Sequence, residues 1–128
     1  MKRKPPHYRV YARIARSKIH GVGVVAIRRI KKGTHIFYGD DAELVWLDRK
    51  TVSRLPLELK KLYKDFAVVR GNRYGCPKNF NLLTPAWYLN HSKHPNVACD
   101  ANYNFFATKD IQKGEELTVD YDSYSDKP

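Results

Sequence analysis

Two short segments near the C-terminal end of the chain carry residue types suited to binding and positioning a ligand. The first, residues 90–96, sets an amide, an imidazole and a hydroxyl side by side and ends in a Pro-Asn turn signal. The second, residues 114–121, begins with a glycine turn, continues as a β-prone run and ends on Tyr121. A tyrosine hydroxyl has an ordinary pKa near ~10, so at neutral pH it is better suited to positioning a reactant than to removing a proton.

The first segment also offers one alternative chemistry, a zinc site. His91, His94 and Cys99 have a spacing that a zinc ion could accept. Structural zinc sites use closed sets of four ligands, and no fourth ligand is evident nearby in the sequence. We therefore expect no metal at this position.

A third segment, near the N-terminal end, could bring the main chain close to a ligand. Residues 17–26 contain Gly21 and Gly23, and glycine permits a close approach of the backbone. A third glycine and a βαβ context, both typical of dinucleotide sites, are lacking. The pattern therefore disfavours a Rossmann-type cofactor site, and a simple tight turn is the other interpretation.

In this order and at this separation, the segments resemble the signature motifs of the SET domain, the S-adenosylmethionine (SAM)-dependent protein-lysine methyltransferase module. The resemblance covers about residues 8–122. It implies a mainly β SET-domain fold, with a small helical insert and several short sheets around a C-terminal pseudoknot. Residues 1–128 would form a single domain, with a basic segment at 1–7, the helical insert at about 40–80, and the pseudoknot motifs at 88–121.

The resemblance also implies roles for individual residues. Tyr121 would be the catalytic residue, lying beside the transferring methyl group and orienting the amine through C–H···O contacts. The residues implied to bind SAM are His20, Gly21, Val22, Gly23, Tyr38, Asn90 and His91. Candidates for the wall of the lysine channel are Tyr74, Phe106, Val119 and Tyr124. Aromatic faces in such a wall would attract an ammonium group, and core packing is the other interpretation for each single aromatic residue.

Methyl transfer to lysine is an in-line displacement in which a neutral amine attacks the methyl group of a sulfonium. Lysine has an ordinary pKa near ~10.4, so only about one side chain in a few thousand is neutral at pH 7. The site has to lower that pKa by desolvating the amine and by placing it near the sulfonium charge. A narrow aromatic channel with a few oriented hydroxyls and carbonyls meets this demand without a metal or a covalent nucleophile.

Two departures from the family pattern concern this lysine channel. Many SET enzymes carry a cysteine-rich, zinc-binding tail that completes the channel, whereas residues 122–128 contain no cysteine. Tyr124, or a second subunit in a homodimer, could close the channel instead. Val119 occupies a position where many relatives have Phe or Tyr, and its smaller side chain predicts room for multiple methylation.

Most of the chain is expected to form strands and turns. Alternation and β-prone runs predict strands at 8–16, 24–27, 34–38, 67–69, 104–107 and 117–119. Apolar residues at helical spacing predict an amphipathic helix over 55–66, with a shorter one beginning near Asp48. Residues 71–77 are expected to form a loop. Residues 26–33 and 107–114 share Ala, Ile, Lys and Gly at the same offsets, which indicates one strand-turn-strand unit used twice.

Composition favours some classes of protein over others. Hydrophobic residues make up 42% of the 128 residues, which favours a folded single domain over a disordered chain. No apolar run is long enough to span a membrane, and the two cysteines give no disulfide framework. We therefore expect no membrane association and an intracellular protein, cytoplasmic or nuclear.

The net charge of +11 is concentrated in the N-terminal third, because residues 1–39 carry eleven Lys or Arg and no Asp or Glu. This asymmetry predicts association with nucleic acid, chromatin or ribosomes through residues 2–32, or else a solvated surface. Six of the thirteen acidic residues lie within 110–128, which suits a basic protein substrate docking near Tyr121. Three hypotheses follow: a SAM-dependent lysine methyltransferase acting on a histone-like or ribosomal protein, a SET-fold binding module with weak turnover, and a nucleic-acid-associated protein.

Overall fold

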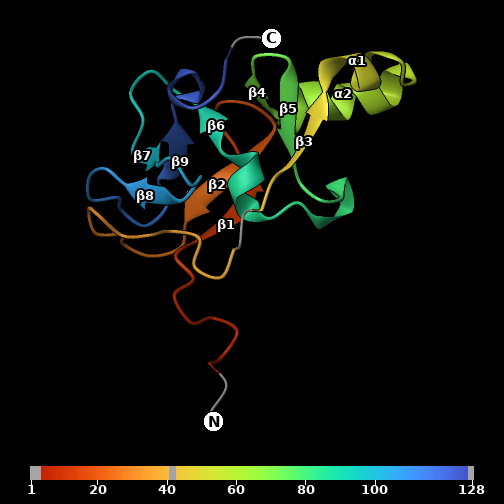
Figure 1. Ribbon diagram of the computed structural model, residues 1–128. Coiled ribbons are helices and arrows are strands. Elements are labelled where there is room, and N and C mark those ends of the chain that lie inside the picture. The colour runs from red at the N-terminus through yellow and green to blue at the C-terminus, as the bar shows by residue number, and fades with distance from the viewer. Residues whose placement is uncertain (1–3, 41–42, 127–128) are drawn as a thin grey trace.

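The computed structural model describes residues 4–40 and 43–126, and two β-sheets form its framework (Figure 1). The larger sheet has the order β1-β2-β9-β7-β8, with β6 paired to β9. Its strands are β1 (Ala12–Arg16), β2 (Val22–Ala26), β6 (Asn90–His91), β7 (Val97–Cys99), β8 (Phe105–Ala107) and β9 (Glu116–Val119). The smaller sheet has the order β3 (Val45–Asp48), β5 (Arg73–Cys76) and β4 (Val68–Arg70). This mainly β architecture confirms the predicted fold class.

Strand β9 joins the parts of the larger sheet. It runs antiparallel to β2, with Leu117 opposite Val24, and parallel to β6 and β7. The side chain of Asn96 fixes this arrangement, because it donates to the carbonyl of Glu116 at 2.9 Å and accepts the N–H of Thr118 at 2.8 Å. Asn96 is buried, so both amide atoms find partners inside the fold. The two C-terminal motifs therefore lie side by side.

The hydrophobic core is built on the larger sheet and unites both ends of the chain. Its completely buried side chains are Val24, Ile30, Ile111, Leu117 and Val119. Burying an aliphatic side chain of this size contributes about 1.5–3 kcal/mol to folding. Aromatic residues from the rim pack against this cluster, among them Tyr11, Phe37, Phe105 and Tyr124.

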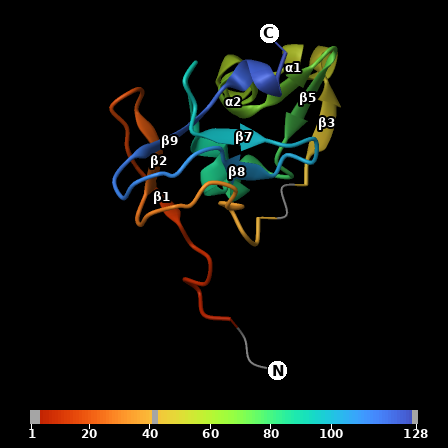
Figure 2. The same ribbon diagram turned by 90° about the vertical axis from the view of Figure 1, so that its left-hand side faces the viewer.

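The two similar segments of the sequence pair with each other. Ile30 and Ile111 exchange backbone N–H···O hydrogen bonds of 2.8 Å in both directions. The carbonyl of the alanine that begins each segment accepts from the glycine that ends the other, at 2.8 Å for Ala26 with Gly114 and 2.7 Å for Ala107 with Gly33. The repeated pattern is thus a reciprocal pair of turns. Figure 2 shows the orange turn that follows β2 near the blue turn that precedes β9.

Two helices lie beside the smaller sheet, α1 (Arg49–Ser53) and α2 (Leu57–Phe66) (Figure 1). Both predicted helices are confirmed, and α2 begins two residues later than expected because Pro56 caps it in an extended conformation. The ring of Phe66 meets Tyr88 at 5.5 Å between centroids, which ties α2 to the short 3-10 helix Pro85–Tyr88. Two further 3-10 helices span Phe80–Leu82 and Tyr121–Ser123. None of the described helices is long and apolar enough to cross a membrane.

Three expectations about strands need correction. Residues 71–77, predicted as a loop, contain β5, which pairs with β3 on one side and β4 on the other. Within β5, Gly75 lies under the ring of Trp46, and a Cβ there would be 2.8 Å from that ring. The predicted strand at 34–38 forms only isolated bridges with partners outside it. The predicted strand at 8–16 begins as regular structure only at Ala12.

Candidate active site

Tyr121 follows β9 directly and begins the last 3-10 helix. Its hydroxyl donates to the carbonyl oxygen of Leu89, and its backbone N–H donates to Nδ1 of His91 at 3.0 Å. Both partners lie at β6, which runs parallel to β9, so strand pairing positions the tyrosine. Burial raises the pKa of the Tyr121 hydroxyl above its ordinary value. The phenol is therefore neutral at physiological pH and can serve as a hydrogen-bond donor.

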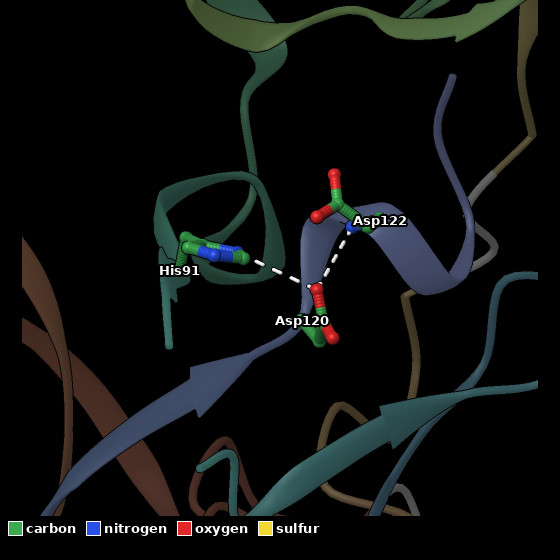
Figure 3. A group of neighbouring side chains, drawn as sticks. All are labelled: His91, Asp120 and Asp122. Atoms are coloured by element: carbon green, nitrogen blue, oxygen red, sulfur yellow. Dashed lines mark hydrogen bonds and ion pairs between the residues drawn. The ribbon is translucent and has the colours of Figure 1, made fainter. Parts of the chain in front are cut away.

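His91 and two carboxylates surround the turn that carries Tyr121 (Figure 3). Nδ1 of His91 lies 3.7 Å from a carboxylate oxygen of Asp120, and the backbone N–H of Asp122 donates to that same carboxylate at 3.0 Å. Potential ligand atoms of these three residues lie within 4.8 Å of one another. The ammonium group of Lys93 already lies 2.6 Å from Asp122 and 3.9 Å from Asp120, and supplies the positive charge at this cluster.

The zinc site considered from the sequence would use His91, His94 and Cys99 rather than this cluster. Within the described parts of the chain, the close group of ligand atoms includes His91 but neither His94 nor Cys99. The thiol of Cys99 instead points to the carbonyl of Asp100 at 3.4 Å. The structure therefore does not bring the possible zinc ligands His91, His94 and Cys99 together.

A cavity of about 270 Å³ lies next to Tyr121. Aromatic side chains from both sheets, from helix α2, from the 3-10 helix Pro85–Tyr88 and from two turns line it, namely Phe66, Tyr74, Trp87, Tyr103, Phe105, Tyr121 and Tyr124. Its acidic lining residues are Asp40, Asp65, Asp122 and Asp126. Among the described residues that line it, Lys64 alone is a Lys or Arg. Aromatic faces and an excess of carboxylates favour a cationic group on an apolar stem, such as a lysine side chain.

The segment after Tyr121 forms one wall of this cavity. Tyr124 packs edge-on against Tyr121 and Phe105, with ring centroids 6.3 and 5.9 Å away. The following residues fasten to β4, because Asp126 donates its N–H to the carbonyl of Val69 at 2.8 Å and Ser125 accepts the N–H of Val69 at 2.9 Å. Burial raises the pKa of Tyr124, which is therefore neutral as well. Residues 122–126 thus form one wall of the cavity without a cysteine.

The four candidates for the lysine channel fall into two groups. Tyr74 and Tyr124 line the cavity together with Tyr121. Phe106 and Val119 are not among the described residues that line it. Phe106 instead lies against His35, with ring centroids 5.2 Å apart, and Val119 is completely buried in the core. The structure therefore brings only half of the predicted channel residues to the tyrosine.

The predicted cofactor residues at 20–23 and 90 form one cluster. The side-chain nitrogen of Asn90 lies 2.9–3.2 Å from four acceptors, which are Ser17 Oγ, Glu116 Oε2 and the carbonyls of His20 and Val22. A Cβ at Gly23 would lie 2.5 Å from Glu116 Oε2 and 2.8 Å from the same Asn90 nitrogen. Gly23 is thus required by close packing, and Gly21 by its left-handed backbone, with φ +51°.

This cluster changes the interpretation of Asn90. Because its amide nitrogen is directed at acceptors within the protein, Asn90 holds the 17–23 turn in place. Main-chain groups of the turn are bonded internally as well, since the N–H groups of Ile19 and His20 donate to Ser17 Oγ and the carbonyl of Gly21 accepts from Ser17. Sequence reasoning missed Ser17 and Glu116 as site residues, although both lie inside the recognised segments. Ser17 donates to the carboxylate of Glu116 at 2.8–2.9 Å, although the two residues are 99 positions apart in the sequence. No local sequence pattern indicates such a pair.

Tyr38 lies apart from the other predicted cofactor residues. Its ring packs edge-on against Tyr8 at 5.3 Å, and the guanidinium of Arg9 lies 5.3 Å from its centre. Tyr38 lines a second cavity of about 270 Å³, bounded by residues 9–12, 36–40 and 84–85. Asp40 is the single described residue common to the two cavities.

A comparison with protein families matches residues 21–122 to the SET domain. The chain belongs to the SET-domain family. Two fungal proteins named histone-lysine N-methyltransferase set9 are similar to this SET domain. The one from Aspergillus terreus is 35% identical over 112 residues, and the one from Aspergillus oryzae is 33% identical over 106 residues. Each match covers 80% of the chain but only 16% of the fungal protein.

A solved structure supports the same fold. The crystal structure of a candidate histone methyltransferase from Plasmodium falciparum is similar to this SET domain with a TM-score of 0.55 and 23% sequence identity. The similarity covers 88% of the chain and 93% of the solved one. The predicted SET-domain fold is thereby confirmed.

The residues around Tyr121 in this SET domain fit a sulfonium cofactor. The hydroxyl of Tyr121 and the carbonyl of Leu89 are in contact at the cavity wall, where oxygen atoms and aromatic faces can surround a positively charged sulfur. Since Nδ1 of His91 accepts a hydrogen bond, the neutral ring carries its proton on Nε2 and can donate from there.

Proposed function

We propose that this SET domain transfers methyl groups from S-adenosylmethionine to lysine side chains of a basic protein, histone-like or ribosomal in type. The observation that carries the proposal is the position of Tyr121 in the wall of an aromatic cavity with four carboxylates. The names of the two fungal relatives support lysine methylation as the reaction. The acidic lining supports a basic substrate, because carboxylates attract Lys and Arg side chains from solution.

The cavity first attracts the substrate lysine and then desolvates its amine. Its carboxylates, including Asp40 and Asp126, attract the protonated side chain. Rings such as Tyr74, Trp87 and Tyr124 then replace water around the amine, and desolvation favours the neutral form that can attack a methyl group. Bound SAM would supply that methyl group on a positively charged sulfur.

Tyr121 acts in this proposal as a positioning group at the reacting atoms. Its proton is directed at the carbonyl of Leu89, which leaves the lone pairs of the hydroxyl oxygen free to face the amine and the methyl group. Because burial keeps the phenol neutral, it does not compete for the proton of the lysine. Correct positioning of this kind can account for several kcal/mol of the barrier.

The test is transfer of labelled methyl groups from SAM to purified core histones and to ribosomal proteins, with calorimetry of SAM binding. In Tyr121→Phe we expect the transfer rate to fall by about a hundredfold or more, a loss of the size found for other single positioned polar groups, with SAM still bound. Tyr103→Phe is the matched control, because Tyr103 lines the same cavity but its hydroxyl contacts Arg70 at 3.3 Å. SAM binding without transfer to any basic protein would favour the binding module, and absence of SAM binding would refute both.

A further inference from the structure

The two paired turns gather basic side chains from distant parts of the sequence. Residues 27–33 and 108–114 carry six of them, Arg28, Arg29, Lys31, Lys32, Lys109 and Lys113, and all six are exposed. We call this set the basic platform. The two turns contain one acidic residue, Asp110, which lies 3.0 Å from Arg29 and also accepts the backbone N–H of Lys32 at 2.8 Å. Reciprocal hydrogen bonds between Ile30 and Ile111 hold the halves of the platform together.

The N-terminal segment extends the basic platform along β1. Arg28 donates to the carbonyl of Val10 at 3.1 Å and stacks over the ring of Tyr11 at 4.4 Å, so residues 9–13 lie beside the first turn. The exposed Arg9, Arg13 and Arg16 belong to this segment. β1 is an edge strand of the larger sheet, since β2 is the one described strand that pairs with it (Figure 2).

Aromatic rings alternate with the cations of this segment. The ammonium of Lys4 lies 4.7 Å from the centre of the Tyr8 ring, and Arg9 contacts both Tyr8 and Tyr38. The side chain of Tyr38 is 49% exposed. Proteins that hold single-stranded nucleic acids combine cations for the phosphates with aromatic rings on which the bases stack.

We propose that the basic platform and the adjoining residues 4–16 bind nucleic acid through its phosphates. The expectation from the sequence placed this contact at residues 2–32, of which 2 and 3 lie outside the described residues; the structure adds residues 108–114. The platform shares no residue with the cavity at Tyr121, so a nucleic acid there leaves the cavity free. The inference does not depend on the proposed methyl transfer.

The test is fluorescence anisotropy of a labelled 20-nucleotide single-stranded RNA, with a 20-base-pair DNA duplex as a second probe, between 50 and 200 mM salt. The platform variant is Lys31→Ala/Lys109→Ala/Lys113→Ala. Its matched control, Lys50→Ala/Arg54→Ala/Lys60→Ala, removes the same charge at α1 and α2. We expect the platform variant to reduce the slope of log affinity against log salt by about 2–3 and to weaken binding about tenfold or more, with the control close to the unmodified protein.

Three outcomes would overturn the proposal. One is the absence of salt-dependent binding to either probe, and another is an equal loss in the two triple variants, which would assign the effect to net charge alone. The third is displacement of the RNA by polyglutamate as effectively as by unlabelled RNA, which would indicate an acidic protein partner. Thermal unfolding of each variant and methyl transfer to an isolated basic protein are measured in parallel, so a folding defect or a failure of the proposed activity is recognised separately.

Discussion

The imidazole of His91 accepts the backbone N–H of Tyr121 at 3.0 Å, so a side chain from one C-terminal motif fixes the residue that ends the other. The two rings lie 5.2 Å apart between centroids. An N–H group can only donate, and Nδ1 of His91 must therefore be unprotonated in this arrangement. His91 thus acts as a positioning residue for Tyr121.

Replacing His91 with Leu should slow methyl transfer, because the N–H of Tyr121 loses its acceptor and the turn is no longer held. The expected loss of stability is about 1 kcal/mol, since the group is partly exposed to water. His91→Asn retains an acceptor oxygen near the same place and should keep more of the transfer rate. Transfer rates and urea unfolding of both variants check this, and equal loss of rate in the two would contradict the positioning role.

Asn90→Asp should make stability depend on pH. The substitution places a second carboxylate 2.9 Å from Glu116 Oε2, and two carboxylates this close cannot both ionise easily. One of their pKa values must rise on folding, so the stability of the variant is present at low pH and is lost as the pH increases. Relative to the unmodified protein we expect a loss of about 1 kcal/mol near pH 4, because a protonated carboxyl has one proton where the amide has two, and a larger loss of about 2–3 kcal/mol at pH 7.

Urea unfolding across this pH range measures the effect. Asn102→Asp is the control, because Asn102 is exposed and its change should give a small, nearly constant difference. A constant loss for Asn90→Asp at all pH values would show that the two carboxylates do not meet.

Gly23→Ala should destabilise the domain by about 2 kcal/mol or more, because the new Cβ would lie 2.5 Å from Glu116 Oε2. Relief of that clash has to displace the contacts between Asn90 and the turn, so SAM binding should weaken as well. Ile14→Ala, at an exposed residue of the neighbouring strand β1, should have a much smaller effect on both. Thermal unfolding and calorimetry provide the two readouts, and unchanged stability of Gly23→Ala would refute the close packing.

The two cysteines should react slowly with thiol reagents at neutral pH. Burial raises the pKa of the Cys76 and Cys99 thiols from 9.0 to about 11. Since the folded state favours the neutral thiols, their contribution to stability is complete below about pH 9 and is lost as the pH rises toward 11. Rates of disulfide exchange with a chromogenic reagent, measured from pH 7 to 10, should therefore increase throughout. Rapid modification of the folded protein at pH 7 would contradict this.

The number of methyl groups transferred remains a prediction from the sequence. A valine at residue 119, in place of Phe or Tyr, predicts that multiple methylation is sterically allowed. In the structure, Val119 is completely buried opposite Val97 and does not line the cavity. Its small side chain can therefore enlarge the lysine site only through the packing of the core. Mass spectrometry of the product should detect di- or trimethyl-lysine, and strictly monomethylated product at long reaction times would count against this expectation.

The parts of the fold that sequence predicted well depend on local spacing. Helix α2 has its apolar residues at helical intervals, and a proline marks its start. Strand β5 was missed because its glycine is explained only by Trp46, a residue on another strand. At 34–38 the β-prone residues find single bridging partners rather than a continuous neighbouring strand, and such partners cannot be recognised from propensity.

In the candidate site, too, residues within local motifs were predicted and residues from distant elements were not. Tyr121 and His91 belong to recognisable motifs, and the structure brings them into contact. Four aromatic residues of the cavity were not predicted, Phe66, Trp87, Tyr103 and Phe105, because they come from separate elements that meet only in the folded protein. The identity of the substrate, the homodimer and the intracellular location stay predictions.

The reciprocal turns have a consequence for the kinetics of folding. Ile30 and Ile111 are 81 residues apart, and the β2–β9 pair joins segments of similar separation. Such contacts form only after a long loop has closed, and topologies rich in them fold slowly, over milliseconds to seconds. The helices α1 and α2 need no such closure. We therefore expect stopped-flow refolding to show helical signal before β9 pairs with β2, β6 and β7, the pairings that join the two halves of the larger sheet.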